Sequence, residues 1–281
     1  MIFLVRRCFF LLIIGLTLSS IQLISLEYGL LAQRIGSVPI TKLAIYSERC
    51  SGSNYIQSLV LQNFDISLEP FCSKHFPPWF ELPPSHYLGN PKNYTFENTD
   101  DYLFIVIFRN PYDWVRSFYD TPHYSSREIK KMGFSEFIRA PWALDLNHEV
   151  VKRQTAFNPL MDRNPTDGSL FKNVLKLREA KIHTMLMIKD RVKNIYYINY
   201  ETARDSPKEV LKEIEKIFEI TSNLTYQPVV YYKGKEDSGV YQKKEYVSIS
   251  RRDLKYINKH LNKNLEKMIG YKLIDDPKEL D

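Results

Sequence analysis

The stretch that decides the fold of this chain is residues 102–119, YLFIVIFRNPYDWVRSFY. Its first part, 102–108, is apolar throughout, as expected of a central parallel strand that is covered on both faces. Arg109 and Asn110 end the apolar run, and Pro111 follows, a residue that is tolerated in the first turn of a helix. The stretch therefore predicts a buried parallel strand that leads directly into a helix.

Two further apolar runs have the same form. Residues 40–46 precede a corner, 47–54, that reads SERCSGSN, and residues 195–199, IYYIN, precede a helix start at 206–209, SPKE. Strands that alternate with helices predict a three-layer α/β/α domain with a mostly parallel sheet. Residues 121–170 fit this alternation poorly, and we interpret them as an insertion over the active face.

The composition is that of a folded domain with an excess of positive charge. Of the 281 residues, 44% are hydrophobic and 14% are aromatic, which favours an ordered core over disorder. The formal net charge of +6 favours anionic ligands and partners. The excess is modest and is spread along the chain, so we expect no nucleic-acid partner.

The N-terminus has the pattern of a membrane anchor. Residues 8–26 carry no charge, and these 19 residues are about the length that crosses a bilayer. Arg6 and Arg7 precede the run, so the positive-inside rule places the N-terminus in the cytosol. A cleaved signal peptide is the alternative, although no small-x-small cleavage site follows the run. The expected organisation is a cytosolic tail 1–7, a transmembrane signal anchor 8–26, a stem 27–39 and one domain 40–281.

Two N-glycosylation sequons, at Asn93 and Asn223, are compatible with a body in the lumen. Of the three cysteines, Cys8 falls in the expected anchor. Cys50 and Cys72 form either one disulfide in an oxidising lumen or two unpaired thiols, and the sequence does not decide between these.

The corner 47–54 has the residue types of an anion-binding helix start. The first backbone N–H groups of a helix lack internal partners, and the helix dipole favours negative charge there. Gly52 allows the backbone to approach a ligand, and its neighbours supply hydrogen bonds and charge: Arg49, Ser51, Ser53 and Asn54. The Walker pattern G-x-x-x-x-G-K-[ST] is absent, which disfavours a standard NTPase loop. A plain helix cap is the other interpretation of this corner.

Arg109 supports the anion interpretation. It would emerge from the strand 102–108 at the same carboxyl edge as the corner, where open α/β sheets bind ligands. Ser117 falls about two turns into the helix that follows. Arg109 and Ser117 could therefore hold a second anionic group beside the first.

In these residues the sequence resembles the sulfotransferases that use 3'-phosphoadenosine-5'-phosphosulfate (PAPS). The family motif R-N-P-x-D-x-x-x-S-x-Y, whose Arg and Ser hold the 3'-phosphate, is matched by RNPYDWVRSFY with Arg109 and Ser117 at the family spacing. The family loop P-K-x-G-T-T-W, which holds the 5'-phosphosulfate, is matched more loosely by residues 51–55, SGSNY. Cys50 stands in place of the loop lysine, and Arg49 is one position before it.

The resemblance implies roles for further residues. Tyr55, at the position of the family's Trp, would stack on adenine, and Tyr200, in a segment similar to Y-E-D-L, would lie near it. Residues 233–239, KGKEDSG, resemble a basic K-G-x-x-G segment that would close over the nucleotide with Lys233, Gly234 and Lys235.

The resemblance also implies the chemistry, which is sulfuryl transfer from PAPS to a hydroxyl or an amine. The family often supplies a histidine base in K-x-H-x-P, and here CSKHFP places His75 directly after Lys74. We expect His75 to be the general base and Lys74 to lie near the transferred group; the rivals as base are Glu48, Glu81 and His86. We expect no metal, because Cys72 and His75 are followed by no second ligand pair.

The sequence thus predicts a P-loop-like, PAPS-dependent sulfotransferase in the Golgi membrane, single-pass type II, with a lumenal catalytic domain. Its acceptor would be a glycan, a protein or a small molecule. Two alternatives stay open. One is a non-catalytic anion- or glycan-binding relative, and the other is a P-loop-like nucleotide kinase, which the missing Walker lysine disfavours.

Overall fold

The computed structural model describes residues 29–69, 73–75, 79, 96, 98–157, 160–223 and 225–280, without the side chains of 154–157. Several predictions from the sequence lie outside these residues: the anchor over 8–26, the sequon at Asn93, and Cys72, Glu81 and His86. Within the described part of the chain, no helix is both long enough and apolar enough to cross a bilayer.

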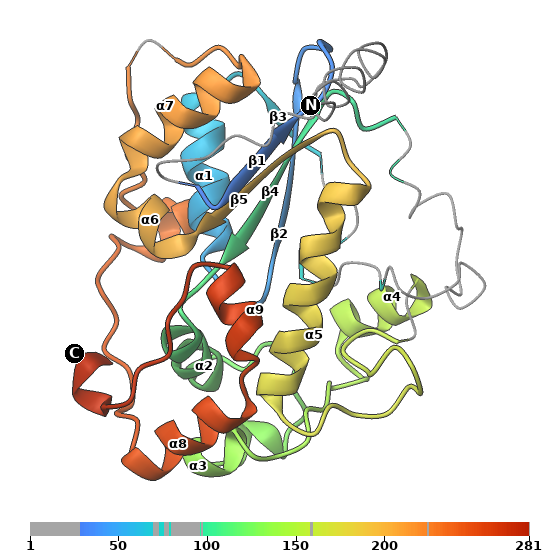
Figure 1. Ribbon diagram of the computed structural model, residues 1–281, viewed down its shortest axis with the longest axis vertical. Helices are drawn as coiled ribbons and strands as arrows, with labels where there is room; N and C mark the ends of the chain where they lie inside the picture. The colour runs from blue at the N-terminus through green and yellow to red at the C-terminus, as the bar shows by residue number, and fades with distance from the viewer. Residues whose placement is uncertain are drawn as a thin grey trace, which may run out of the picture.

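The described residues form a mixed α/β fold around a five-stranded sheet in the order β1-β5-β4-β2-β3 (Figure 1). The centre of the sheet is formed by three parallel strands: β2 (Lys42–Ser47), β4 (Tyr102–Phe108) and β5 (Asn194–Asn199). The short β3 (Ser67–Leu68) extends the sheet in parallel to β2. The predicted mostly parallel sheet is therefore confirmed, with all three central strands close to their expected positions.

The fifth strand corrects the expected stem over 27–39. Residues Leu31–Arg34 form β1, which pairs antiparallel with β5 in the register Leu31↔Tyr197 to Arg34↔Asn194. Ala32 is fully buried in the core of the domain. The folded domain therefore begins before residue 40 and includes part of the segment that we expected to connect it to an anchor.

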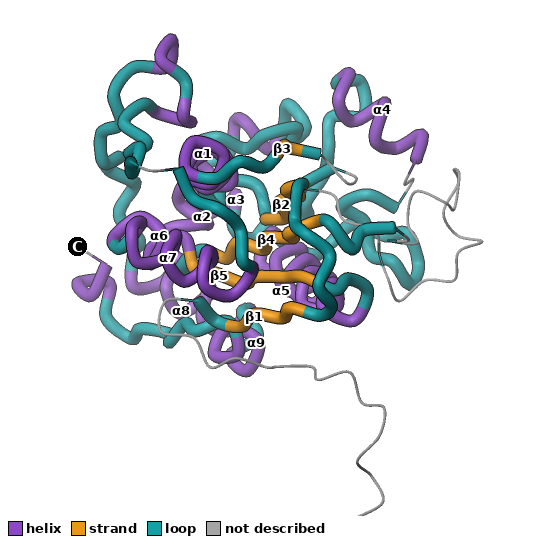
Figure 2. Tube along the Cα trace, turned by 90° about the horizontal axis from the view of Figure 1, so that it is seen from above, coloured by secondary structure: helices purple, strands orange, loops and turns teal. Residues whose placement is uncertain are grey.

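Helices cover both faces of the sheet. On one face, α1 (Ser53–Asn63) and α7 (Pro207–Phe218) pack on alternate strand residues such as Ile45 and Ile105. On the other face, α5 (Val174–Leu186) and α9 (Lys263–Met268) pack on the intervening residues, such as Phe104 and Val106. Figure 2 shows α1 and α7 on one side of the strands and α5 on the other. This double burial explains why the central strands are apolar at every position.

A third core lies beyond the carboxyl ends of the strands. It joins α2 (Pro111–Asp120) to α3 (Phe134–Phe137) and α8 (Arg251–His260), which all lie in the lower part of Figure 1. Trp142 from the 121–170 segment is fully buried there. That segment also contains α4 (Glu149–Phe157) and the 3₁₀ turn η3 (Ile129–Lys131). The 121–170 segment therefore packs into this third core together with α2 and α8.

Short elements complete the described fold. After β5 the chain turns directly into α6 (Tyr200–Asp205), and α5 is followed by the turn η4 (Met187–Asp190). Two turns, η5 (Tyr232–Gly234) and η6 (Glu236–Ser238), interrupt an otherwise irregular segment before α8, and η7 (Pro277–Leu280) follows α9.

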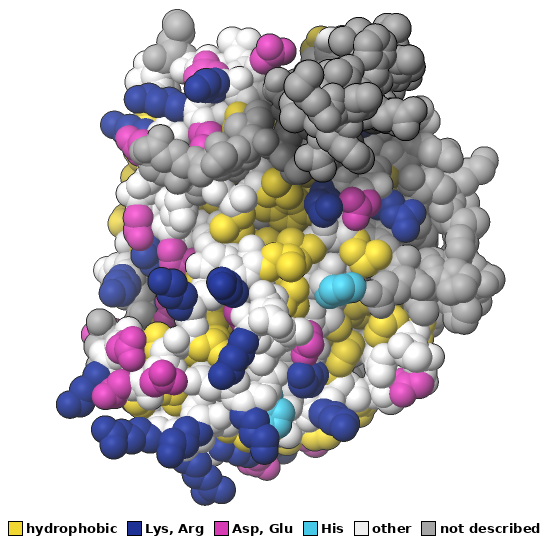
Figure 3. All heavy atoms as spheres, viewed as in Figure 1, with side chains coloured by type: hydrophobic (Ala, Val, Ile, Leu, Met, Phe, Trp, Pro, Cys, Tyr) yellow, Lys and Arg dark blue, Asp and Glu magenta, His cyan; other side chains and the backbone are white. Residues whose placement is uncertain are grey.

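Positive charge gathers on one part of the surface. The exposed side of α8 carries Arg251, Arg252, Lys255 and Lys259, and Figure 3 shows basic side chains concentrated over this lower part of the molecule. Asn223, in the second sequon, is exposed, and its side-chain amide donates to the carbonyl oxygen of Gln62 at 2.8 Å. Cys50 is a free thiol.

Candidate functional site

A cavity of about 710 Å³ opens at the carboxyl edge of the sheet, where β2 turns into α1 and β4 turns into α2. Residues from both turns line it, together with the start of α6 and the irregular segment before α8. Ten residues that the sequence singled out line this one cavity: Cys50, Gly52, Ser53, Asn54, Tyr55, His75, Arg109, Ser117, Tyr200 and Lys233.

Gly52 shapes the corner at the start of α1. Its φ of 82° lies in the left-handed region, and a Cβ at this position would lie 2.1 Å from a ring carbon of Tyr200. Only glycine fits both the backbone conformation and the space. No side chain caps this helix start, and its first turn contains no acidic residue. The first N–H groups of α1 are therefore left to bind an anion that enters the cavity.

Arg109 faces the corner from the end of β4. Its Nη1 donates to the carbonyl oxygen of Cys50 at 2.7 Å and its Nη2 donates to the hydroxyl of Tyr246 at 3.2 Å. Its guanidinium also lies 5.1 Å from the ring centre of Tyr200. The buried Nε of Arg109 has no hydrogen-bond partner among the described residues. Neutral groups thus hold this cation in place, and its positive charge and its Nε–H can still interact with an anionic ligand.

The cavity wall as a whole is positive. Five cationic side chains line it, and none of the lining residues that the structure describes is Asp or Glu: Arg109, Arg204, Lys233, Lys243 and Lys244. Two of these cations are paired from outside the wall, Arg204 with Asp205 at 2.6 Å and Lys244 with Asp120. The arrangement favours a ligand that carries several negative charges.

Arg49 and Ser51 do not line the cavity. The Arg49 side chain is buried against Asp162, with which it forms an ion pair, and the indole of Trp114 donates to the Arg49 carbonyl oxygen at 2.9 Å. Ser51 is fully buried, and its hydroxyl has no hydrogen-bond partner among the described residues. Arg49 therefore does not replace the missing loop lysine in this structure, and it serves to anchor the corner.

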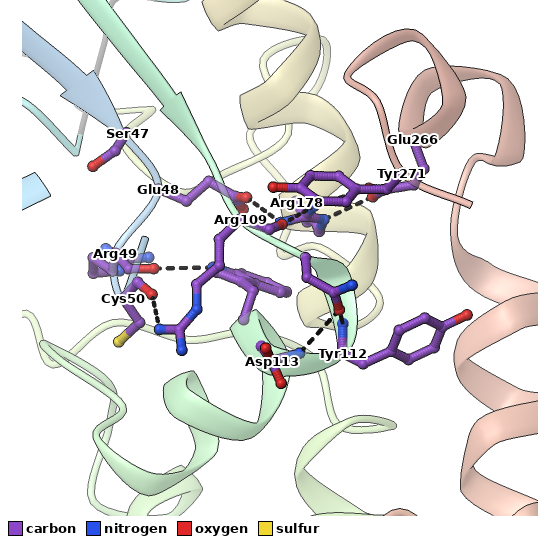
Figure 4. A network of polar contacts seen from close by, with 12 residues as sticks. Ser47, Glu48, Arg49, Cys50, Arg109, Tyr112, Asp113, Arg178, Glu266 and Tyr271 are labelled. Atoms are coloured by element: carbon purple, nitrogen blue, oxygen red, sulfur yellow. Dashed lines mark hydrogen bonds and ion pairs between the residues drawn. The ribbon is translucent and has the colours of Figure 1, made fainter. Parts of the chain in front are cut away.

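A buried ionic network connects the two turns, as Figure 4 shows. Arg178 of α5 pairs with Glu48 at 2.6 Å and with Glu266 at 2.7 Å. Its Nη2 also donates to the backbone oxygen of Arg109 at 2.9 Å. Through Glu48, Arg178 thereby links the corner to the first residue after β4, and the two anion-facing turns are held relative to each other.

Neither Cys50 nor Lys74 brings a cation into the cavity at the position expected of the loop lysine. Burial raises the pKa of the Cys50 thiol to about 11, so this side chain is neutral and brings no charge to the cavity. Lys74 is partly buried beside the corner, and its Nζ donates to Asn54 Oδ1 at 2.5 Å. Burial and the nearby Lys235 lower the pKa of Lys74. Lys74 thus lies beside the helix start without lining the cavity itself.

His75 lines the cavity next to the corner. Its Nδ1 lies 3.1 Å from the carbonyl oxygen of Ser47, so Nδ1 carries the hydrogen and Nε2 is the free acceptor. Burial, reinforced by the positive charge of Lys74, lowers the pKa of His75 to about 3. The imidazole is therefore neutral at physiological pH, as an acceptor of a proton must be.

The pKa of His75 predicts part of the acid sensitivity of the fold. Between about pH 3 and the ordinary value near 6.5, the unfolded chain binds a proton at this residue that the folded chain does not. The neutral imidazole of His75 therefore contributes fully to the free energy of unfolding above pH 6.5, and this contribution is lost as the pH falls. When the pH is lowered from 6.5 to 4, the free energy of unfolding should therefore fall less in His75→Gln than in the parent chain. Denaturant titrations at both pH values measure this, and equal losses would contradict it.

The segment 225–250 covers the cavity from the side of α1. Lys233 lines the cavity, whereas Gly234 and Lys235 do not. Gly234 has a φ of 69°, and a Cβ there would lie 1.8 Å from the Ser58 hydroxyl oxygen on α1. The contact of Gly234 with Ser58 holds this segment against α1 and places Lys233 at the cavity.

Sequence reasoning missed several residues that the fold brings to the cavity. Tyr246, which bonds Arg109, lies 137 residues away from it in the chain, and Arg204 follows Tyr200 on α6. Thr121 and His123 line the cavity just beyond the end of α2. No local pattern marks these residues, because only the tertiary fold places them here.

Comparison with known proteins does not assign a function to this cavity. The chain matches no protein-family model, and a search of curated proteins finds no significant match. Among the described residues, no group of three or more His, Cys, Asp or Glu side chains is arranged to hold a metal ion.

Proposed function

We propose that this protein transfers a sulfuryl group from PAPS to a hydroxyl or amine of a glycan, protein or small-molecule acceptor. The observation that carries the proposal is the cavity between Gly52 and Arg109, whose wall is cationic and includes no carboxylate among the described lining residues. Its volume of about 710 Å³ lies in the range of ordinary ligand sites.

The residues at the cavity fit the groups of this nucleotide. The 5'-phosphosulfate would lie on the uncapped start of α1, which Gly52 opens to a ligand. Arg109, whose Nε has no partner among the described residues, and Ser117 would hold the 3'-phosphate. Tyr55 and Tyr200 meet edge to face with ring centres 6.1 Å apart and would contact the adenine.

Positioning and charge stabilisation would supply most of the catalysis. The acceptor oxygen would attack sulfur in line with the departing phosphate, whose charge would be met by the N–H groups of α1 and by Lys74. His75 would contact the acceptor through its free Nε2. Lys233, on the covering segment, would help to close the site from water.

The N-terminal pattern favours a location for this activity. We propose a single-pass type II protein of the Golgi membrane, with the cavity on the lumenal side, where PAPS would be the donor. The first described residues, Gly29 and Leu30, donate backbone hydrogen bonds to the Glu213 carboxylate and to the Tyr197 carbonyl oxygen.

Incubation of the full chain with PAPS and a panel of glycan, peptide and phenolic acceptors tests the proposal. Mass spectrometry should detect an acceptor that gains one sulfuryl group, together with release of 3'-phosphoadenosine-5'-phosphate (PAP). Binding of PAP without transfer to any acceptor would favour the non-catalytic alternative. Turnover of ATP in place of PAPS would favour a nucleotide kinase.

A further inference from the structure

One strongly charged surface takes no part in the proposed nucleotide site. It is the exposed side of α8 and α9, which contributes no residue to the described wall of the large cavity. α8 lies at the lower end of the molecule in Figure 1, where Figure 3 shows basic side chains close together. We call this surface the basic face, and define it by its exposed cations: Arg251, Arg252, Lys255, Lys259, Lys263, Lys267 and Lys272.

No exposed carboxylate within residues 250–272 balances the basic face. The two acidic residues of this range both point inward. Asp253 is 7% exposed and pairs with Arg139 at 2.6 Å, and Glu266 is 2% exposed and pairs with Arg178 at 2.7 Å. None of the cations of the basic face forms an ion pair with another described residue. Their charge is therefore free to attract a partner of opposite charge.

α7 shows that an exposed basic row on a helix does not by itself produce such a surface. Lys208, Lys212 and Lys216 are exposed on α7 at intervals of four residues. The same helix carries three glutamates, so its charges cancel: Glu209, Glu213 and Glu215. The basic face has no such compensation, and an uncompensated cluster of cations favours a polyanionic partner.

The spacing of the cations on α8 fits an extended polypeptide. Arg251, Lys255 and Lys259 lie four residues apart, so they share one side of the helix at steps of about 6 Å along its axis. In an extended chain, every second side chain lies on the same side, at steps of roughly 6.4–6.8 Å. Acidic residues at alternate positions would therefore meet the three cations in turn, and the guanidinium fork of Arg251 can bind a carboxylate through two hydrogen bonds.

Other polyanions fit α8 less well. Its large aliphatic side chains, Leu254 and Ile257, are buried, so the helix has no apolar surface to insert into a bilayer. The ring of Tyr256 is already covered, by the Arg139 guanidinium at 4.3 Å and by the His260 ring at 3.9 Å. It therefore offers no platform on which a nucleic-acid base could stack.

We propose that the basic face is a docking surface for an extended acidic polypeptide segment, with Asp or Glu at alternate positions along the row Arg251, Lys255 and Lys259. This inference goes beyond the proposed function and does not rest on it, because the basic face and the described wall of the cavity share no residue.

Fluorescence anisotropy of a labelled peptide of alternating Glu and Ser, titrated with the full chain in detergent at low salt, tests the proposal. The parent chain should bind the peptide, and added salt should weaken the binding because the charges are exposed. The triple variant Arg251→Gln, Lys255→Gln, Lys259→Gln should bind it about 10-fold more weakly, as expected for the loss of three exposed ion pairs. The matched control on α7, Lys208→Gln, Lys212→Gln, Lys216→Gln, should bind it as the parent chain does.

The outcomes separate this inference from the proposed function. A parent chain that does not bind the peptide, or a triple variant on α8 that binds it as tightly as the parent, would overturn the inference. Tighter binding of a heparin fragment of equal charge at the same residues would replace the polypeptide with an acidic glycan. PAP affinity should be the same in the parent chain and in both triple variants. Failure of the parent to bind PAP would overturn the proposed function and leave the basic face as described.

Discussion

Arg178→Met is expected to lower the free energy of unfolding by about 3–5 kcal/mol, the cost of removing one partner from a buried ionic network. The Arg178 side chain is fully buried, and it pairs with Glu48 and Glu266, which are themselves almost fully buried. Methionine would fill much of the same volume, but it would leave two carboxylates in the core without their cation. The backbone oxygen of Arg109 would also lose its donor.

Lys176→Met on the same helix is the matched control. Its ammonium pairs with Glu179 at 2.6 Å, but the two side chains are 41% and 30% exposed, so the loss should be at most about 1 kcal/mol. Denaturant titration of both variants measures the difference. Equal small losses would show that the network of Arg178, Glu48 and Glu266 does not stabilise the fold as described.

Gly52→Ala should destabilise the corner and abolish tight nucleotide binding. An alanine in the left-handed region costs about 1–2 kcal/mol, and its Cβ would lie 2.1 Å from the ring of Tyr200. That ring is 8% exposed, so it has little room to move aside. For a domain of this size, the strain alone would lower Tm by about 2–8 °C.

Gly133→Ala provides the control for this substitution. Gly133 precedes α3 with a φ of −70°, and no atom lies within 4 Å of the Cβ that it would gain. Thermal unfolding should therefore show no loss for Gly133→Ala and a clear loss for Gly52→Ala. If Gly52→Ala keeps both the Tm and the affinity of the parent chain for PAP, the corner does not have the role assigned to it.

The central strands could be predicted because burial on both faces leaves a continuous apolar run. Residues 102–108 and 195–199 have this signature, and the structure places β4 and β5 there. β1 could not be predicted in this way. Its sequence, LAQR, is short and half polar, and its burial depends on pairing with β5, which lies more than 150 residues further along the chain.

The site was predictable where its residues follow directly from strand ends. Gly52, Arg109 and Ser117 stand at fixed distances after two buried strands, and the parallel sheet brings them to one cavity. Arg49 follows the same strand end, yet its side chain turns into the core because Asp162, 113 residues away, is buried beside it. A sequence does not show such a partner.

The most direct test of the proposed nucleotide site is calorimetric binding of PAP to the full chain in detergent, beside Arg109→Ala and the exposed control Arg251→Ala. We expect micromolar binding of PAP by the parent chain and by Arg251→Ala. Loss of the guanidinium contact in Arg109→Ala should cost about 1.5–3 kcal/mol, or roughly 10- to 150-fold in affinity. A folded parent chain that does not bind PAP would contradict the proposed nucleotide site and leave the corner as an ordinary helix start.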